Sequence, residues 1–352
     1  MKTFFVGLKD KLITIKETAN GYQFKESLHE TNPTRLAFDP SNKQRIYCAT
    51  NGDGLWRSED GGEHWSNIGV PSMASDLPKN RGISSSKMTA VAVHPTKKVN
   101  GHSVVYAGTE PSMLFYSEDH GESWHEFEGL QKMPSQKDWA FPPRPWTHYV
   151  RWITPSYSNK DHLAVSIEAG AVLNSYDHGK TWKDRTEDSP IDVHTLLAHP
   201  KAPKRLYAAN GDGKGRSYAE SYDEGLTWIY MTEGLEQHPY GYHLVLHPEN
   251  PTDRLISASK SASSAHGSNR YSTIYRKVDT APWIELADGL PREDAFTHHL
   301  ANDPENVGAF YALNNFGLFY LKPGGNQWER LDIPWEEYEN KRPYFFAVEV
   351  LD

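Results

Sequence analysis

The amino-acid sequence predicts an all-β protein that folds as a seven-bladed β-propeller over residues 1–352. Three observations predict this fold: a short motif ending in tryptophan recurs along the chain, an apolar stretch ending in proline precedes each copy, and strand-like runs lie at both ends. Successive tryptophans of the motif are about 45 to 60 residues apart, which is the spacing of four-stranded propeller blades.

The recurring motif has the form Ser-x-Asp-x-Gly-x-x-Trp. Four clear copies occupy residues 58–65, 117–124, 175–182 and 221–228, and two decayed copies keep mainly the tryptophans at 283 and 328. Serine and aspartate side chains hydrogen-bond nearby backbone amides in turns, and glycine adopts positive φ readily. We therefore expect a structural role for the box aspartates Asp60, Asp119, Asp177 and Asp223.

An apolar stretch ending in proline precedes each motif, at residues 36–40, 91–95, 152–155, 196–200, 244–248 and 300–304. Proline cannot donate to a strand ladder, so each marks the turn between two strands. A second β-rich run follows each proline, which gives units of four strands from about residue 31 to 335. Three of these turns carry a histidine before the proline (His94, His199 and His247), and we assign these histidines to turn formation.

The strands left over at the two ends predict the seventh blade. Residues 3–8, 12–16, 21–28 and 342–350 are strand-like, and pairing the ends removes the exposed edges that an open ring would leave. We expect a single domain over 1–352, with a closing blade from 1–30 plus 342–352. A six-bladed ring with extra strands is the alternative.

Composition excludes several functional classes. The chain has 37 Lys+Arg against 46 Asp+Glu and a net charge of −9, which argues against a phosphate-binding surface and therefore against nucleic acid as a partner. A single cysteine, Cys48, excludes an internal disulfide and a cysteine-rich zinc site. No apolar run approaches the ~20 residues of a membrane helix. We expect no membrane association, and a cytoplasmic location because the apolar N-terminal patch is too short for a signal peptide.

The motifs resemble the Asp-box (BNR) repeats of sialidases and related propellers. Three copies fit the pattern fully, and His64 replaces Ser/Thr in the first. The chain also resembles bacterial BNR-repeat proteins of the glycosyl hydrolase type, including the segment 139–152. This resemblance implies a propeller fold, which serves sialidases and xyloglucanases as well as sorting receptors and photosystem assembly factors. The Arg-Ile-Pro tripeptide that carries the first substrate arginine of sialidases is absent here.

The start of each innermost strand and the end of the next strand should meet at one mouth of the channel, where ligand sites occur. Two carboxylates that flank a sugar bond can act as acid and base or nucleophile, and histidine carries protons near neutral pH. We predict Glu110, Glu168 and His194 as catalytic residues. Arginine clamps anionic groups, and the predicted substrate-binding residues are Arg35, His148, Arg151, Asn210, His243, His298 and Arg342.

Four consecutive units place histidine at nearly equivalent positions: His148, His194, His243 and His298. Neutral imidazoles suit divalent transition metals, so one interpretation is a metal site with Glu168 as an oxygen ligand. The other interpretation is a hydrated channel in which the histidines bind water and one another.

The sequence thus predicts a hydrolase or lyase of a sugar or related small polar metabolite. Two alternatives stay open: a non-catalytic binding or assembly propeller with a protein partner, and a metal-dependent enzyme that uses the histidines. The longest departures from the repeat are residues 131–145, 71–86 and 259–271. A segment 131–145 that covers the channel mouth would favour a small-molecule ligand, and an open rim would favour a protein partner.

Overall fold

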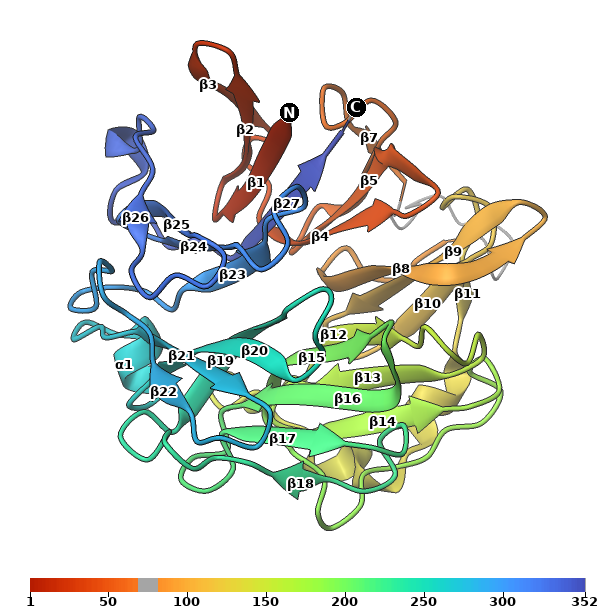
Figure 1. Cartoon of the computed structure of the whole chain (residues 1–352). Coiled ribbons are helices and arrows are strands. Elements are labelled where there is room, and N and C mark those ends of the chain that lie inside the picture. Colours follow the sequence, from red (N-terminus) through yellow and green to blue (C-terminus); the bar gives the residue numbers. More distant parts are fainter. Residues whose placement is uncertain (69–81, 352) are drawn as a thin grey trace.

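Seven antiparallel β-sheets are arranged in a ring in the computed structural model, which describes residues 1–68 and 82–351 (Figure 1). We call the space along the axis of this ring, where two cavities lie, the central channel. The innermost strands contact one another in ring order, and the last of them, β27 (Phe345–Val350), contacts the first, β4 (Pro33–Asp39). The seven-bladed prediction is therefore confirmed, and the six-bladed alternative is wrong. Most of the predicted segment 71–86 lies outside the described residues.

Six repeat sheets follow the chain, each built from the channel outwards. The first contains β4, β5 (Asn42–Thr50), β6 (Gly54–Ser58) and β7 (Ser66–Asn67). The second contains β8 (Met88–Val99), β9 (His102–Thr109), β10 (Leu114–Ser117) and β11 (His125–Glu126). The third contains β12 (Val150–Pro155), β13 (Leu163–Ile167) and β14 (Ala171–Ser175), with a bridge from Asn174 to Lys183 at the outer position.

The remaining repeat sheets have four strands each. The fourth contains β15 (Val193–His199), β16 (Ala202–Asn210), β17 (Tyr218–Ser221) and β18 (Ile229–Tyr230). The fifth contains β19 (Tyr240–Leu246), β20 (Asp253–Ser259), β21 (Thr273–Val278) and β22 (Ile284–Glu285). The sixth contains β23 (His299–Asn302), β24 (Phe310–Asn314), β25 (Gly317–Leu321) and β26 (Glu329–Arg330).

The closing sheet joins the two ends of the chain, as expected. β27 is innermost and pairs with β1 (Lys2–Leu8), followed by β2 (Lys11–Thr18) and β3 (Gly21–Ser27). The β1–β27 register runs from Lys2 opposite Val350 to Gly7 opposite Phe345. Phe4, Phe5 and Val6 of β1 are buried, so this strand supplies apolar packing as well as hydrogen bonds.

Helices are short. The described residues contain one α-helix, α1 (Ala262–His266), and three 3₁₀ helices, η1 (Glu128–Lys132), η2 (Pro134–Asp138) and η3 (Glu336–Tyr338). None of the helices in this part of the chain has the length and apolar character needed to cross a bilayer.

Strand alternation separates two sides of the ring. We call the side at which the innermost strands begin the upper side. The proline turns, which join first to second strands, and the Asp boxes, which join third to fourth strands, therefore lie on the lower side. In the second box, Ser117 Oγ accepts from Gly121 N at 2.8 Å and Asp119 accepts from Ser123 N at 2.9 Å. Asp60, Asp177 and Asp223 make the same backbone contact in the other boxes.

The box glycines also let neighbouring sheets approach. Gly179 has a φ of +77°, and a Cβ at this position would lie 2.1 Å from the ring of Phe127, which follows β11 of the preceding sheet. At Gly121, a Cβ would lie 2.6 Å from Ile68, which follows β7. The second and third boxes therefore close their own turns and pack on the outer edge of the preceding sheet.

Threonine hydroxyls join adjacent innermost strands near their upper ends. Thr34 donates to the carbonyl of Met88 at 2.9 Å, and Thr89 donates to that of Val150 at 2.8 Å. Thr195 donates to the carbonyl of Tyr242 at 2.9 Å. These bonds fix the height of each strand against its neighbour and therefore the positions of the side chains at the upper mouth.

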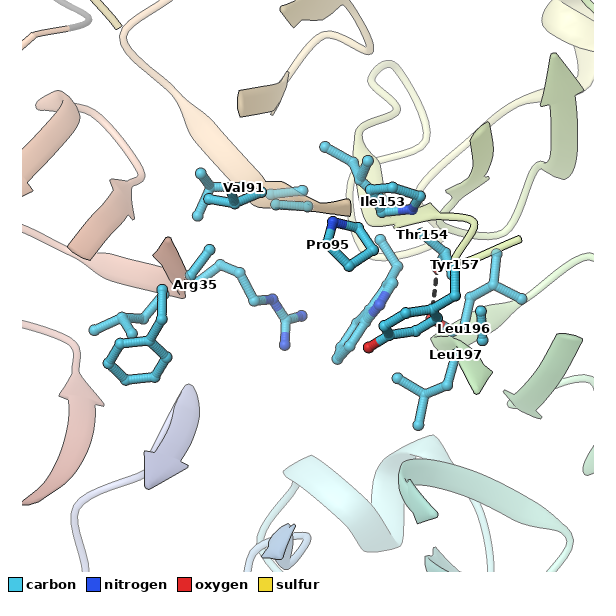
Figure 2. Close-up of a pocket in the computed structure, with 17 residues that line it drawn as sticks. Arg35, Val91, Pro95, Ile153, Thr154, Tyr157, Leu196 and Leu197 are labelled. Carbon is cyan, nitrogen blue, oxygen red and sulfur yellow. Dashed lines mark hydrogen bonds between the residues drawn. The ribbon is translucent and has the colours of Figure 1, made fainter. Parts of the chain in front are cut away.

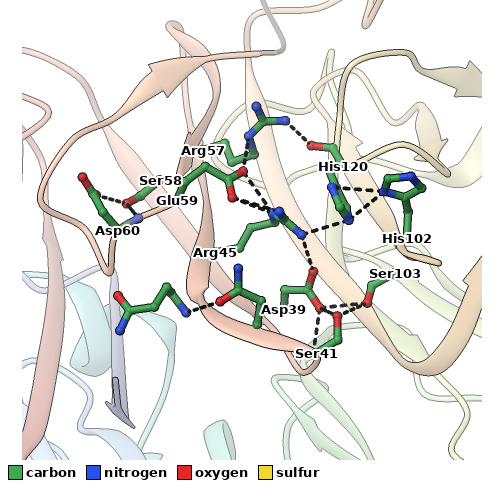
Figure 3. Close-up of polar contacts among 12 residues, drawn as sticks. Asp39, Ser41, Arg45, Arg57, Ser58, Glu59, Asp60, His102, Ser103 and His120 are labelled. Carbon is green, nitrogen blue, oxygen red and sulfur yellow. Dashed lines mark hydrogen bonds and ion pairs between the residues drawn. The ribbon is translucent and has the colours of Figure 1, made fainter. Parts of the chain in front are cut away.

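Polar contacts join the first two repeat sheets on the lower side (Figure 3). Buried Asp39 accepts from Ser103 of the next sheet at 2.8 Å and pairs with Arg45 at 3.2 Å. Arg45 also contacts His120 of the second box, and His120 contacts His102 at 3.0 Å. The histidines before the prolines form the turns as expected: His94 accepts from Lys97 N.

A fully buried ion pair joins the fourth and fifth repeat sheets. Arg254 and Glu220 are both inaccessible to solvent and lie 2.7 Å apart, and Arg254 also contacts the Tyr218 hydroxyl at 2.9 Å. Arg205 approaches the second oxygen of Glu220 at 2.8 Å. The Glu220 carboxylate thus compensates the charges of Arg205 and Arg254.

We expect Glu220→Gln to lower the free energy of unfolding by about 3 kcal/mol or more, because it leaves a buried guanidinium uncompensated. Urea denaturation measures this loss. The matched control is Glu329→Gln, since the Lys322–Glu329 pair is exposed and such pairs contribute about 1 kcal/mol or less. Equal losses in the two variants would contradict this assignment.

Candidate functional site

A cavity of about 180 Å³ occupies the upper half of the channel. Its walls come from the first residues of innermost strands and from the segments just before them, and they include Thr34, Thr89, Tyr149, Arg151, Tyr242, Arg342 and Tyr344. Most of these positions are those at which the sequence predicts a mouth. We refer to this space as the upper cavity.

The insertion 131–145 contributes to the upper cavity. Phe141 and Arg144 line it. Arg144 forms a two-point ion pair with Glu110, at 2.5 and 2.8 Å. The insertion is also tied down at its start, where Ser135 donates to Asp184 through both its backbone and its hydroxyl. The mouth is therefore partly covered, which is the arrangement expected for a small-molecule ligand.

Arg151 and Arg342, two of the three arginines on the cavity wall, differ in their charge partners. Arg151 lies 3.2 Å from Glu168. Glu168 and the phenols of Tyr242 and Tyr149 raise the pKa of Arg151 although burial opposes its charge. Arg342 lies against the rings of Phe296 and Tyr344 and has no ion pair or side-chain hydrogen bond to any residue in the described ranges. The cavity therefore carries unsatisfied positive charge.

Tyr242 is the phenol most affected by these charges. Burial alone would raise the pKa of its hydroxyl, but Arg151, Arg342 and His194 oppose burial and lower this pKa to about 7. Tyr149 behaves in the opposite way, because burial and the neighbouring Glu168 raise its pKa. Of the three tyrosines that line the cavity, Tyr242 is thus close to ionisation at neutral pH.

Glu168, Asp192 and His194 cluster behind the wall. His194 Nε2 lies 3.7 Å from Glu168 and 3.6 Å from Asp192. His194 Nδ1 is 2.7 Å from the carbonyl of Gly241 and therefore donates to it, which leaves Nε2 facing both carboxylates. Burial raises the pKa of Asp192, and the repulsion of Glu168 adds to this effect.

These three residues are the one group in residues 1–68 and 82–351 that could supply three metal ligands close together. Gly211 makes room for them, because a Cβ there would lie 2.2 Å from Asp192 and 2.6 Å from His194. A glycine at this point of the ring is therefore needed to seat both side chains.

A second layer of aromatic residues backs His194. The Tyr240 hydroxyl lies 3.2 Å from His194 Nε2 and 3.3 Å from His266 Nε2, which belongs to α1. Burial, together with the charges of Arg342 and His194, lowers the pKa of His266 to about 2. The insertion 259–271 thus places a neutral imidazole next to the cluster.

The other predicted histidines are not brought together with His194. His148 packs against Trp139 of the insertion, with ring centroids 5.5 Å apart. His298 lies between Ser272, at 2.8 Å, and Asn314, at 3.0 Å. Burial lowers the pKa of His298 to about 3, so it is neutral.

His243 and the remaining predicted binding residues lie away from the cavity wall. His243 accepts from the backbone of Leu300 at 3.2 Å, and burial, with the charges of Arg35 and Arg151, lowers its pKa to about 3. Asn210 is fully buried and donates to the carbonyl of Arg216. Arg35 lines the lower half of the channel.

Several residues of the site were absent from the predicted set. Tyr242 precedes His243 at the start of a predicted innermost strand, so its position was available from the repeat. Arg144 and Asp192 lie outside the repeated strands, and no sequence pattern marks the charges that they meet. Tyr240 and His266 meet through an insertion that the repeat does not predict.

The BNR/Asp-box repeat family matches residues 115–126, which include the second box. Together with the seven sheets, this match decides the architecture. The chain is a BNR-repeat β-propeller. No curated protein sequence matches it significantly.

Solved structures share the fold at low identity. The GH74 enzyme of Niastella koreensis has a TM-score of 0.64 and 15% identity, over 92% of this BNR-repeat propeller and 53% of that chain. An ancestral GH74 enzyme has a TM-score of 0.61 and 16% identity, over 85% of this chain and 38% of that chain. YCF48 bound to a D1 peptide has a TM-score of 0.58 and 17% identity, over 85% of this chain and 81% of that chain. The chain therefore spans about half or less of the two GH74 enzymes.

We expect one tyrosine of the protein to ionise near pH 7, being neutral below this pH and phenolate above it. Ultraviolet difference titration of the phenolate absorption should show this step, and Tyr242→Phe should remove it. Tyr176→Phe is the matched control, because burial raises the pKa of that tyrosine to about 12. A titration in which no tyrosine ionises below pH 9 would contradict the assignment.

Proposed function

We propose that this propeller is a hydrolase or lyase of a sugar or related small polar metabolite that carries an acidic group, and that it acts in the upper cavity. The observation that carries the proposal is a partly covered space of about 180 Å³ with three arginines on its wall, one of which, Arg342, has no anionic partner in the described ranges. Guanidinium groups bind carboxylates strongly in such surroundings.

The residues divide into binding and proton-transfer roles. Arg342 and Arg151 bind the acidic group of the substrate. Tyr242 lines the cavity beside Arg151 and transfers the proton. In a lyase reaction its phenolate accepts the proton from the carbon beside the substrate carboxylate while the leaving group departs with its bonding electrons. In hydrolysis it accepts the proton from water, whose oxygen bonds to the anomeric carbon while the glycosidic bond breaks and the leaving oxygen takes up a proton from solvent.

Glu168 and His194 hold Arg151 in position and do not touch the substrate in this proposal. Glu168 holds Arg151, and the backbone carbonyl of His194 lies 3.3 Å from Arg151 Nε. Both are positioning residues in this proposal. Glu110 faces the cavity in its ion pair with Arg144 and orients hydroxyl groups of the substrate.

Coverage of the mouth supports a small molecule over a protein partner. Phe141 and Arg144 of the insertion line the cavity, and a bulky partner would have to displace them. The similar structures include both classes, because GH74 proteins are enzymes and YCF48 is found with a peptide. The fold alone does not choose between them.

We expect Arg342→Gln to weaken binding of sugar acids about tenfold or more, since it removes an ionic hydrogen bond. Calorimetry with glucuronate and galacturonate measures the loss, and product formation is followed on their glycosides. Arg292→Gln, which alters an arginine paired with Glu285 outside the cavity, should bind like wild type. Equal affinity of wild type for glucose and glucuronate would contradict the proposal.

A metal-dependent enzyme is the second candidate, favoured by the convergence of Glu168, Asp192 and His194. His194 Nε2 is too far from both carboxylates for direct hydrogen bonds, yet a divalent cation could bind all three side chains. One imidazole and two carboxylates suit Zn²⁺ or Mn²⁺. The ion would act as a Lewis acid or would activate water.

This alternative predicts about one divalent ion per chain after equilibration with Zn²⁺ or Mn²⁺ and dialysis. Asp192→Asn and His194→Gln should both lose the ion, and His29→Ala, which removes an exposed histidine, should keep it. Elemental analysis of wild type and variants measures the content. A wild-type protein without bound metal would eliminate this candidate.

A further inference from the structure

A second cavity, of about 260 Å³, occupies the lower half of the channel (Figure 2). Its walls come from β4, β8, β12 and β15 and are largely apolar, with Ala37, Ala92, Ile153, Leu196 and Leu197 among the lining residues. Small alanine side chains leave the space open. We refer to it as the lower cavity.

Arg35 separates the two cavities. Its guanidinium lies 4.0 Å from the centre of the Trp152 ring, and Figure 2 shows its side chain extending into the open space from the side opposite Tyr157. Trp152 packs in turn against His243, and His243 packs against His299. Arginine, tryptophan and two histidines thus form a partition across the channel.

Arg35 forms no ion pair within the described residues. Within residues 1–68 and 82–351 it also makes no side-chain hydrogen bond, and its Nε is buried without a partner. Burial lowers the pKa of Arg35, the repulsion of Arg151 lowers it further, and the charge of Glu168 opposes both effects. The histidines of the partition are neutral because burial lowers their pKa values.

An uncompensated buried cation is costly unless an anion joins it. Guanidinium groups keep their proton in proteins, so an anionic ligand in the adjoining cavity would lower the cost at Arg35 without deprotonation. The apolar side chains around Arg35 favour a ligand whose remaining atoms are apolar. Tyr157, which is 41% exposed, also lines the cavity and has a hydroxyl that makes no hydrogen bond within the described residues.

We propose that the lower cavity is a second ligand site, separate from the upper cavity, for a small carboxylate with a planar apolar body. The carboxylate pairs with Arg35, and the apolar body fills the space between Trp152 and the aliphatic wall. The volume of about 260 Å³ is below the roughly 300–1,000 Å³ of sites for drug-sized molecules, which limits the ligand to the size of a single ring with short substituents.

Calorimetry with benzoate tests this site on the full-length protein. We expect benzoate to bind with a Kd below about 1 mM and neutral benzamide to bind at least about tenfold more weakly. Arg35→Met, which keeps the apolar contacts of the arginine stem, should abolish benzoate binding. It should also raise the melting temperature of the free protein, because an unpaired buried charge is removed.

Arg342→Met is the matched variant for the upper cavity and should leave benzoate binding unchanged. Loss of binding in Arg342→Met together with retention in Arg35→Met would place the carboxylate in the upper cavity and overturn the proposal. Equal binding of benzoate and benzamide would overturn the role of Arg35. Absence of benzoate binding below about 1 mM would overturn the site itself.

Discussion

The pairing of β1 with β27 is the contact on which the channel depends. Each repeat sheet presents its innermost strand to the channel, and the ring is complete only when the last strand of the chain joins the first. Propellers distribute their stability over many neighbour-to-neighbour interfaces, and here glycine-mediated packing of the boxes and threonine bonds between innermost strands serve those interfaces. Arg342 and Tyr344 directly precede β27 and line the upper cavity, so closure also builds part of the site.

The channel is divided into two chambers of different chemistry. The upper cavity is polar, with carboxylates and phenols that balance some of its arginine charge, whereas the lower cavity is apolar and ends at one unpaired arginine. Arg35 and Arg151 repel each other across the partition. An anion bound in either chamber would therefore reduce this repulsion and alter the electrostatic environment of the other chamber.

Most of the fold was predictable from the sequence, whereas only part of the site was. The boxes and the proline turns are local patterns with local causes, so their period gave the number of sheets, and the strands at 3–8 and 342–350 predicted the closure. The start of each innermost strand was also predictable, which placed Arg151 and Arg342 correctly at one mouth. Strand register decided the rest: a difference of one residue sends Arg35 to the lower chamber and His243 into the partition. The pairing of Arg144 with Glu110 and the position of His266 depend on insertions, whose paths no repeat specifies.

The central claim is that the upper cavity binds the acidic group of a small polar molecule. A crystal structure of the protein grown with a sugar acid such as glucuronate tests this claim most directly. The account predicts the sugar carboxylate between Arg342 and Arg151, with the ring beneath Phe141 and Arg144 and in contact with Tyr242. A sugar bound only at the outer surface, or an upper cavity that holds only water at saturating ligand, would contradict it.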